Sequence, residues 1–314
     1  MTSSALVIGE AVLDVVHLPG AAAPYERPGG SAVNVAVALA RLGRPVRLAT
    51  GYADDAAGAL VAAHLRAAGV GLAGDPHVLA ATPRADAVVD ATGAASYTFD
   101  VTWRLPAVPE DPDGPPHAVH VTSLAPLLAP GADDVLALVD RLAPTTCVTY
   151  DVNLRPAITG AGPGVVKQVL RMASSATLVK ASDEDLAALW PDRSVGESAS
   201  ALLALGGRGP VAVVVTHGGA GASWHACAGA DWSTGGVHAE PVAVVDTIGA
   251  GDTFAAALVD HLWPLLGPGG RDRLAALGPD DWSAALAWAA RAAAVTVGRV
   301  GADPPTRADL VAAH

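Results

Sequence analysis

The chain has 314 residues, of which 51% are hydrophobic and 16% are charged. This composition can supply a buried core and argues against disorder. The 31 acidic and 19 basic residues give a net charge of −12, which disfavours nucleic acids and anionic membranes as partners. Two cysteines, Cys147 and Cys227, are too few for a disulfide framework or a zinc site, and they suit a reducing compartment.

The first 16 residues lack the basic start of a signal peptide, and Glu10 and Asp14 interrupt their apolar run. No segment has 18 uninterrupted apolar residues, so we expect no membrane span. These features together predict a cytoplasmic protein.

Short β-branched segments alternate with longer segments rich in Ala and Leu, a pattern typical of βαβ units and a parallel sheet. The expected strands are residues 5–9, 46–50, 118–122, 147–151, 177–181 and 211–216. The expected helices lie near residues 31–42, 55–68, 132–142, 164–173, 183–190, 197–205, 251–266 and 281–297. The pattern predicts an α/β fold, a Rossmann-like three-layer αβα domain with a mostly parallel central sheet.

Two regions depart from this alternation. Residues 11–18 are expected to continue the first strand, and residues 85–103 indicate a hairpin around the turn 90–93. We expect them to form a small β-sheet that leaves the body as a lid, with segments at about 11–28 and 75–104. A lid over the carboxyl edge of the sheet would cover the place where α/β sheets bind ligands. The chain 1–314 is therefore expected to be one domain.

A glycine-rich turn stands between two aspartates in "DTIGAGDTF", residues 246–254. A strand is expected to end near Val245, and a helix is expected to start near Asp252. Unpaired amides at such a turn and helix start form a site for an anion. The alternative is that Asp252 is an ordinary N-cap, which stabilises a helix by about 1 kcal/mol.

A second glycine motif, "RPGGSAVNVAVALARLG", covers residues 27–43. Gly29 and Gly30 precede the expected helix, and Asn34 lies one turn into it. The alternative is a capped amphipathic helix, with Ser31 as its cap and the glycines as a turn. Asn34 is an amide in a mostly apolar helix, and it needs a hydrogen-bond partner if it is buried.

The two motifs together resemble the amino- and carboxy-terminal signatures of the ribokinase-like (PfkB) carbohydrate kinase family. Further segments follow in the order of that family: residues 9–16, 51–58, 96–99, 151–156, 180–186, 215–221 and 301–305. "DVNLRP" and "KASDED" are most similar to the fructokinase and 2-keto-3-deoxygluconate kinase branch. The resemblance implies a ribokinase-like fold and ATP-dependent phosphorylation of a sugar's primary hydroxyl, with Mg²⁺ on the phosphates.

The resemblance also implies roles for individual residues. Asp252 would be the general base, in the ionised form that a helix N-terminus favours. The amides of Gly249, Ala250 and Gly251 would form the anion hole. The sugar would be bound by Asp14, Gly29, Gly30, Asn34 and Arg155. The nucleotide would be bound near Lys180, Ser182, Thr216, Gly218 and Gly221.

Two cation sites are implied, and each differs from the family pattern. The family's N-x-x-E, which organises Mg²⁺-bound water, is replaced by residues 182–185, "SDED". The resemblance therefore leaves open whether Asp185 or Glu184 takes this role. Asp246 and Ile248 would lie at a monovalent-cation site, but Pro305 stands where ribokinase has a hydroxyl near K⁺. A requirement for K⁺ is therefore left open.

The sequence leaves several substrates open. Fructose needs only neutral hydrogen-bond partners, whereas 2-keto-3-deoxygluconate would need Arg155 and a further cation in the pocket; ribose is a third possibility. A function of a different class is a catalytically inactive sugar-binding regulator, which the intact Asp252 and "GAGD" turn argue against. A small sugar and ATP are the expected partners. A homodimer through the lid is expected by family analogy alone.

Overall fold

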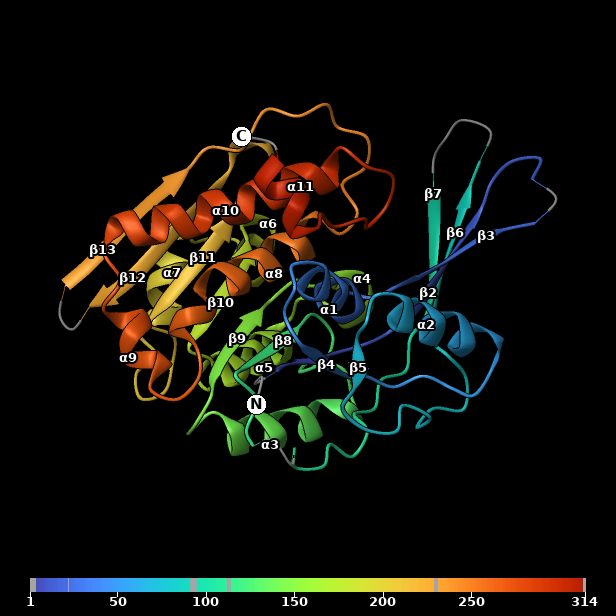
Figure 1. Cartoon of the computed structure of the whole chain (residues 1–314), viewed down its shortest axis with the longest axis horizontal. Coiled ribbons are helices and arrows are strands. Elements are labelled where there is room, and N and C mark those ends of the chain that lie inside the picture. Colours follow the sequence, from blue (N-terminus) through green and yellow to red (C-terminus); the bar gives the residue numbers. More distant parts are fainter. Residues whose placement is uncertain (1–3, 22, 91–94, 112–113, 229–230, 313–314) are drawn as a thin grey trace.

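Two β-sheets organise the chain in the computed structural model, which describes residues 4–21, 23–90, 95–111, 114–228 and 231–312 (Figure 1). The larger sheet lies between two layers of helices, and the smaller one projects from the side of this body. The α/β fold with a mostly parallel central sheet and a small second sheet is therefore confirmed.

The larger sheet has nine strands within the described residues, and its centre is parallel. In spatial order the strands are β13 (Asp231–Val237), β12 (Ala222–Ala228), β11 (Ala212–Thr216), β10 (Leu178–Ser182), β9 (Cys147–Asp151), β8 (Ala118–Thr122), β1 (Ala5–Ile8), β4 (Val46–Ala49) and β5 (Gly71–Leu72). Only β12 and β13 run antiparallel to their neighbours in this sheet. The central strands are buried on both faces, as is typical of a parallel sheet between helices.

Each face of this sheet packs against its own helices. One layer consists of α1 (Ser31–Arg41), α2 (Ala56–Ala67), α8 (Ala250–Leu262), α9 (Gly270–Ala275), α10 (Pro279–Val297) and α11 (Arg307–Ala312). The other consists of α3 (Gly131–Leu142), α5 (Pro163–Ala173), α6 (Asp183–Leu189) and α7 (Val195–Leu203). Successive residues of β1 alternate between the two cores, with Val7 in the first and Ile8 in the second.

Shorter helical turns connect these elements. They are α4 (Pro156–Thr159), η1 (Gly218–Ala220) and η2 (Trp263–Leu265). The helix expected at 251–266 ends at Leu262, and the chain continues as the 3₁₀ turn η2. The second residue of this turn, Pro264, lacks the amide hydrogen that the interior of an α-helix needs.

The small sheet, which we call the lid sheet, has the order β3 (Tyr25–Gly29), β2 (Val12–His17), β6 (Arg84–Val89) and β7 (Ala95–Asp100). All four strands fall in or next to the segments expected for the lid. β6 and β7 pair as the expected hairpin, whereas residues 91–93 of its expected turn lie outside the described residues.

One expectation about strands was wrong. Residues 11–18 do not continue the first strand, because β1 ends at Ile8 and β2 belongs to the lid sheet. Two strands were not predicted: η1 is followed by β12, which starts at Ala222 and pairs with β13. That hairpin is rich in Gly, Ala and Ser, so its strands depend on pairing with β11 rather than on local propensity.

The longest described helix, α10, has 19 residues. Within the described ranges, no helix combines the length and the hydrophobicity that crossing a bilayer would require.

Candidate active site

A cavity of about 390 Å³ lies where the lid sheet meets the carboxyl edge of the larger sheet, and we call it the lid cavity. Strands β2, β6 and β7 contribute one wall, and residues that follow β1, β8 and β9 contribute another. Eight of the residues predicted for the site line it: Asp14, Gly30, Asn34, Arg155, Ile248, Gly249, Gly251 and Asp252.

Asp252 lies in the first turn of α8 but does not cap it. The helix begins at Ala250, and its N-cap is Gly249, whose φ of 76° is a left-handed conformation that favours glycine. The alternative of Asp252 as an N-cap is therefore wrong. The first amides of α8 have no intrahelical acceptor, and the turn 249–251 that carries them borders the lid cavity.

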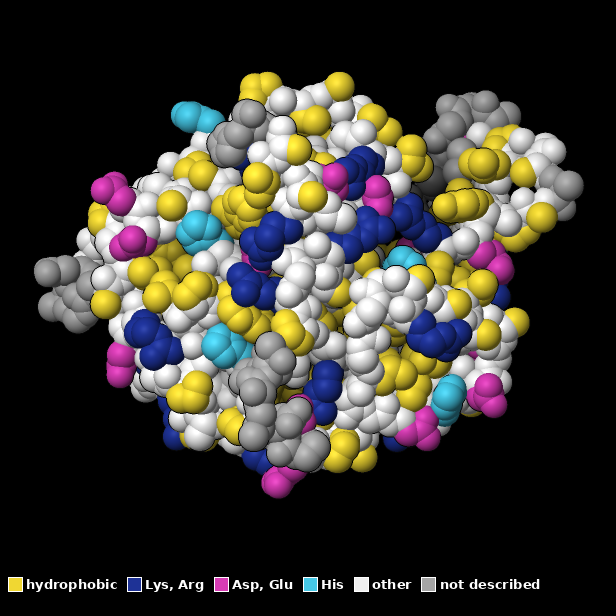
Figure 2. Space-filling view, in the orientation of Figure 1, with side chains coloured by type: hydrophobic (Ala, Val, Ile, Leu, Met, Phe, Trp, Pro, Cys, Tyr) yellow, Lys and Arg dark blue, Asp and Glu magenta, His cyan; other side chains and the backbone are white. Residues whose placement is uncertain are grey.

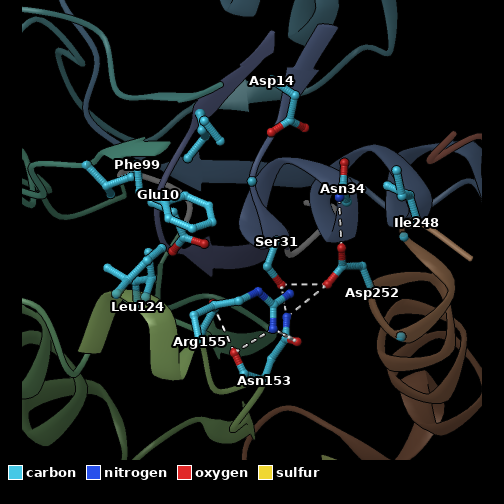
Figure 3. Close-up of a pocket in the computed structure, with 18 of the residues that line it drawn as sticks. Glu10, Asp14, Ser31, Asn34, Phe99, Leu124, Asn153, Arg155, Ile248 and Asp252 are labelled. Atoms are coloured by element: carbon cyan, nitrogen blue, oxygen red, sulfur yellow. Dashed lines mark hydrogen bonds between the residues drawn. The ribbon is translucent and has the colours of Figure 1, made fainter. Parts of the chain in front are cut away.

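Three side chains from distant segments hold the Asp252 carboxylate (Figure 3). Ser31 Oγ donates to Oδ1 at 2.6 Å, and Asn34 Nδ2 donates to Oδ2 at 2.8 Å. Asn153 Nδ2 donates to Oδ1 at 3.3 Å. The Asp252 side chain is 6% exposed and still lines the cavity, so its orientation is set by these donors and not by solvent.

The Ser31 hydroxyl donates to Asp252 and does not cap its own helix. The N-cap of α1 is Gly30, with no side-chain cap, so the prediction of Ser31 as a cap is wrong. Asn34, by contrast, has the hydrogen-bond partner that its place in an apolar helix requires. Sequence reasoning did not assign Asn153, whose φ of 36° no local pattern indicates, although it lies in the quoted "DVNLRP" segment.

Asp14, on β2, projects into the same cavity from the lid side (Figure 3). Burial raises the pKa of its carboxyl to about 6, and Arg27 opposite it on β3 acts to lower that value. Gly29 does not line the cavity, but a Cβ there would collide with the Asp14 carboxylate. Gly29 thus makes room for Asp14.

Arg155 lines the cavity between the two ends of the site. Its Nη1 donates to Asn153 Oδ1 at 2.7 Å and to the carbonyls of Asn153 and Leu154. Across from it lies Glu10, a buried cavity residue that sequence reasoning did not assign to the site. Its only sequence signal was its place in the "GEAVLDVV" segment.

A second cavity, of about 420 Å³, lies between α8 and α10, and we call it the α10 cavity. The predicted residues Thr216, Gly218, Gly221, Ala250 and Gly251 line it, and its remaining wall is mostly apolar. Thr247 and Gly251 line both cavities. The two cavities therefore meet at the glycine-rich turn.

Lys180 lies in neither cavity wall but directly behind this turn. Its Nζ pairs with Asp151 Oδ2 at 3.0 Å, and both side chains are buried. A Cβ at Gly251 would lie 3.3 Å from the ammonium. Burial raises the pKa of Asp151 to about 7, while Lys180 acts to lower it. A positive group thus backs the start of α8.

The segment 182–185 begins α6 with a capping box. Ser182 Oγ accepts from the Asp185 amide, and Asp185 Oδ2 accepts from the Ser182 amide. Asp185 Oδ1 accepts from the Leu154 amide at 2.7 Å, so both of its oxygens are engaged. Glu184 is exposed and lines a shallow pocket with Gly218, next to the α10 cavity.

Asp246 joins two loops beside the glycine-rich turn. Its Oδ1 accepts from the Ile248 amide at 3.0 Å, and its Oδ2 accepts from the Gly301 amide at 2.8 Å. Both Asp246 oxygens are therefore engaged by main-chain amides. The described residues include no group of three or more His, Cys, Asp or Glu side chains that could hold a metal ion.

The buried Asp252 carboxylate is held at the junction of two cavities, next to the start of a helix that Lys180 backs. This is the arrangement expected of a phosphotransferase that uses an alcohol as acceptor. The model of the pfkB family of carbohydrate kinases matches residues 2–309. The chain belongs to this family.

Individual relatives agree with this family. A fructokinase of Rhizobium leguminosarum bv. trifolii is 33% identical over 274 residues, which cover 82% of this chain and 79% of the relative. The solved structure of a Xylella fastidiosa fructokinase with bound ATP has a TM-score of 0.83 at 23% identity, covering 99% of this chain and 98% of the other. A Vibrio cholerae fructokinase double mutant, solved with fructose, ADP and potassium, has a TM-score of 0.78 at 25% identity, covering 99% and 98%.

Proposed function

We propose that this carbohydrate kinase transfers the γ-phosphoryl group of ATP to a primary hydroxyl of a small neutral sugar, with fructose as the first candidate. The observation that carries the proposal is the junction of the two cavities at the turn 249–251, with Asp252 on the lid-cavity side. The sugar would occupy the lid cavity, and the nucleotide would occupy the α10 cavity. The relatives named fructokinase support the choice of sugar.

Each part of the junction has a proposed role. Asp252 accepts the proton of the attacking hydroxyl, and its three donors keep it aimed at that hydroxyl. The amides of Gly249, Ala250 and Gly251 stabilise the phosphoryl group in transfer, a contribution typically worth about 3 kcal/mol. Mg²⁺ bound to the phosphates would neutralise their charge, with Glu184 or Asp185 acting on its water. Asp246 and its loops would accommodate K⁺.

The charge of the lid cavity favours a neutral sugar over a sugar acid. Its described lining includes three carboxyl groups, Glu10, Asp14 and Asp252, against the single cation Arg155. The Arg155 guanidinium already donates to three acceptors. The charge therefore disfavours 2-keto-3-deoxygluconate, whereas ribose stays a neutral alternative. An ATP-dependent reaction is consistent with work in the cytoplasm.

The lid sheet also supports the proposal of a homodimer. Tyr25 and Val88 are 58% and 51% exposed on it, and Leu18, which directly follows β2, is 53% exposed. Apolar side chains gathered on one small sheet are typical of an interface. Analytical ultracentrifugation tests this part separately, and a monomer at micromolar concentration would reject it.

The experiment that tests the function is a coupled ADP-release assay with a panel of sugars, at fixed Mg²⁺ and with or without K⁺. We expect fructose to give the highest kcat/KM, and Asp252→Asn to lower kcat by about 10²–10⁴ while ATP still binds. Asp192→Asn, an exposed loop substitution, is the matched control. Undiminished turnover in Asp252→Asn would reject the base, and no turnover of any sugar by the wild type would reject the function.

A further inference from the structure

Glu10 is a buried carboxyl group that the proposed chemistry does not use. It lies between β1 and β2, where the chain passes from the larger sheet to the lid sheet. Its residue is 3% exposed, yet it lines the lid cavity. Its Oε2 has no hydrogen-bond partner among the described residues. A buried acceptor without a partner is rare in native proteins and calls for an explanation.

Glu10 and Asp252 lie on opposite sides of the cavity, and Ser31 and Arg155 lie between them (Figure 3). Burial raises the pKa of the Glu10 carboxyl to about 7; the main-chain amides of Glu10 and Ser31 and the Arg155 guanidinium act to lower it, and Asp252 acts to raise it. The partnerless Oε2 is itself buried, in a residue that forms part of the cavity wall.

We propose that Glu10 is a substrate-contacting residue whose carboxyl group accepts a hydrogen bond from a hydroxyl of the bound sugar. This hydroxyl lies away from the one that Asp252 deprotonates, because Glu10 and Asp252 lie on opposite sides of the cavity. The inference rests on the proposed function and adds to it a residue that selects for a particular hydroxyl. A sugar that lacks this hydroxyl leaves a buried acceptor unpaired, which is the condition under which sites discriminate most strongly.

The test combines variants of Glu10 with substrates that each lack one hydroxyl. Wild type, Glu10→Ala and Glu10→Gln are assayed with fructose, or the best sugar of the panel, and with each of its monodeoxy analogues. We expect one analogue to lose about 10- to 100-fold in kcat/KM with the wild type. Glu10→Ala should lose a similar factor in kcat/KM with the parent sugar, and removal of the contacted hydroxyl should cost this variant little more. Removal of any other hydroxyl should lower the kcat/KM of Glu10→Ala by the same factor as it lowers that of the wild type.

Several outcomes would overturn the inference. If the effect of Glu10→Ala on kcat/KM multiplies with the effect of every missing hydroxyl, Glu10 contacts none of these hydroxyls and has a structural role alone. If the kcat/KM of the wild type falls by less than about threefold with every monodeoxy sugar, no hydroxyl of the sugar pairs with a buried acceptor. Glu10→Gln keeps the shape of the side chain, so it carries the test if Glu10→Ala does not fold, and the exposed Glu110→Gln is the control. Failure of the proposed function is distinguishable, because the wild type would then turn over no sugar.

Discussion

The donors that orient Asp252 come from three places far from it in the chain. Ser31 lies 221 residues away, Asn34 lies 218 and Asn153 lies 99. Ser31 also approaches Thr122 Oγ1 at 2.7 Å and accepts from Asn153 Nδ2 at 2.9 Å, so it is the centre of a small polar network. Each member is buried or half-buried, so the loss of Ser31 would remove one donor from Asp252 and one partner each from Thr122 and Asn153.

Ser31→Ala removes the shortest of these hydrogen bonds to Asp252. A hydrogen bond to a charged group contributes about 1.5–3 kcal/mol, so we expect kcat to fall by about 10- to 100-fold. The KM for ATP should change little, because Ser31 does not line the α10 cavity. Steady-state kinetics beside Ser200→Ala, an exposed serine of α7, check this prediction. A kcat equal to that of the control would contradict it.

The two acidic residues at the start of α6 differ in what they can offer to Mg²⁺. Both Asp185 oxygens accept main-chain amides, one from α6 itself and one from Leu154 after β9. The Glu184 side chain extends from the exposed side of the same turn. The element thus uses Asp185 to join two parts of the carboxyl edge and leaves Glu184 accessible.

We therefore expect Asp185→Asn and Glu184→Gln to have different effects. Asp185→Asn cannot offer two carboxylate acceptors, so it should lower the free energy of unfolding by about 1–3 kcal/mol. Glu184→Gln should leave stability within about 0.5 kcal/mol of the wild type but raise the Mg²⁺ concentration needed for half-maximal activity. Denaturant unfolding and Mg²⁺ titrations check the pair. The reverse assignment would follow if Asp185→Asn alone changed the Mg²⁺ requirement.

The expected parallel strands and most of the expected helices match the structure to within about two residues, because their signals are local. The helix expected at 251–266 ends earlier, at Leu262, and the short elements β5, α4, α9 and α11 were not predicted. Periodic apolar residues and the Gly, Pro and Asp residues at their ends act within one element. The β12–β13 hairpin was not predicted, since its residues have weak strand propensity and are ordered by pairing at the edge of the sheet. The passage from β1 to β2 was also missed, because no local signal states which of two sheets a strand joins.

At the scale of the whole molecule, the lid sheet is tied to the body beside the active site. Arg27 Nη1, on β3, donates to the Val300 carbonyl at 3.3 Å. The next residue, Gly301, has a φ of 67°, a left-handed conformation that favours glycine, and a Cβ there would also meet this guanidinium. Gly301 in turn donates to Asp246, which precedes the glycine-rich turn. The lid sheet and the loop that carries the glycine-rich turn are therefore linked through residues 300–301.

Arg27→Ala should loosen this link. We expect the KM for the sugar to rise about three- to tenfold, the equivalent of one ordinary hydrogen bond, and amide exchange to accelerate at residues 25–29 and 299–303. Arg84→Ala is the matched control, because Arg84 lies in the lid sheet and its ion pairs are with lid residues. Equal effects of the two variants on exchange at residues 299–303 would contradict the link.

Several basic side chains lie together on the face that Figure 2 shows. Figure 2 shows Lys and Arg side chains gathered over the region of α1 and α11. The arginines of this region pair with aspartates: Arg41 with Asp303, Arg44 and Arg307 with the buried Asp260, and Arg299 with Asp303 and Asp309. These pairs attach the segment after α10 to α1 and α8, so this charge serves the fold rather than an anionic partner.

Buried carboxyl groups give the whole molecule a pH-dependent stability. Burial raises the pKa of Asp14 to about 6 from an ordinary value of 3.8, and those of Glu10 and Asp151 to about 7. Between pH 4 and 7 the folded state therefore keeps protons that the unfolded state has lost. The part of the free energy of unfolding that these three groups contribute should fall as pH rises through this range. The histidines His64, His120, His225 and His261, whose pKa values burial lowers, contribute with the opposite sign.

Asp14→Asn should remove the part of this dependence that Asp14 causes. We expect the variant to gain stability relative to the wild type, and the gain to be about 1 kcal/mol larger at pH 7.5 than at pH 5. Its KM for the sugar should rise, because the carboxylate in the lid cavity is lost. Thermal unfolding at the two pH values checks the sign, with Asp192→Asn as the control. A gain that is larger at pH 5 would contradict the assignment.

The sequence by itself determined the α/β alternation, the lid segments and the glycine-rich turns, because propensity, periodicity and capping act over a few neighbouring residues. Only the tertiary structure decided that Ser31 turns from its helix to Asp252, that Glu10 faces the same cavity, and that Asp185 joins α6 to the end of β9. The reason is physical: such contacts depend on how sheets and helices pack, which brings together residues that no local pattern relates.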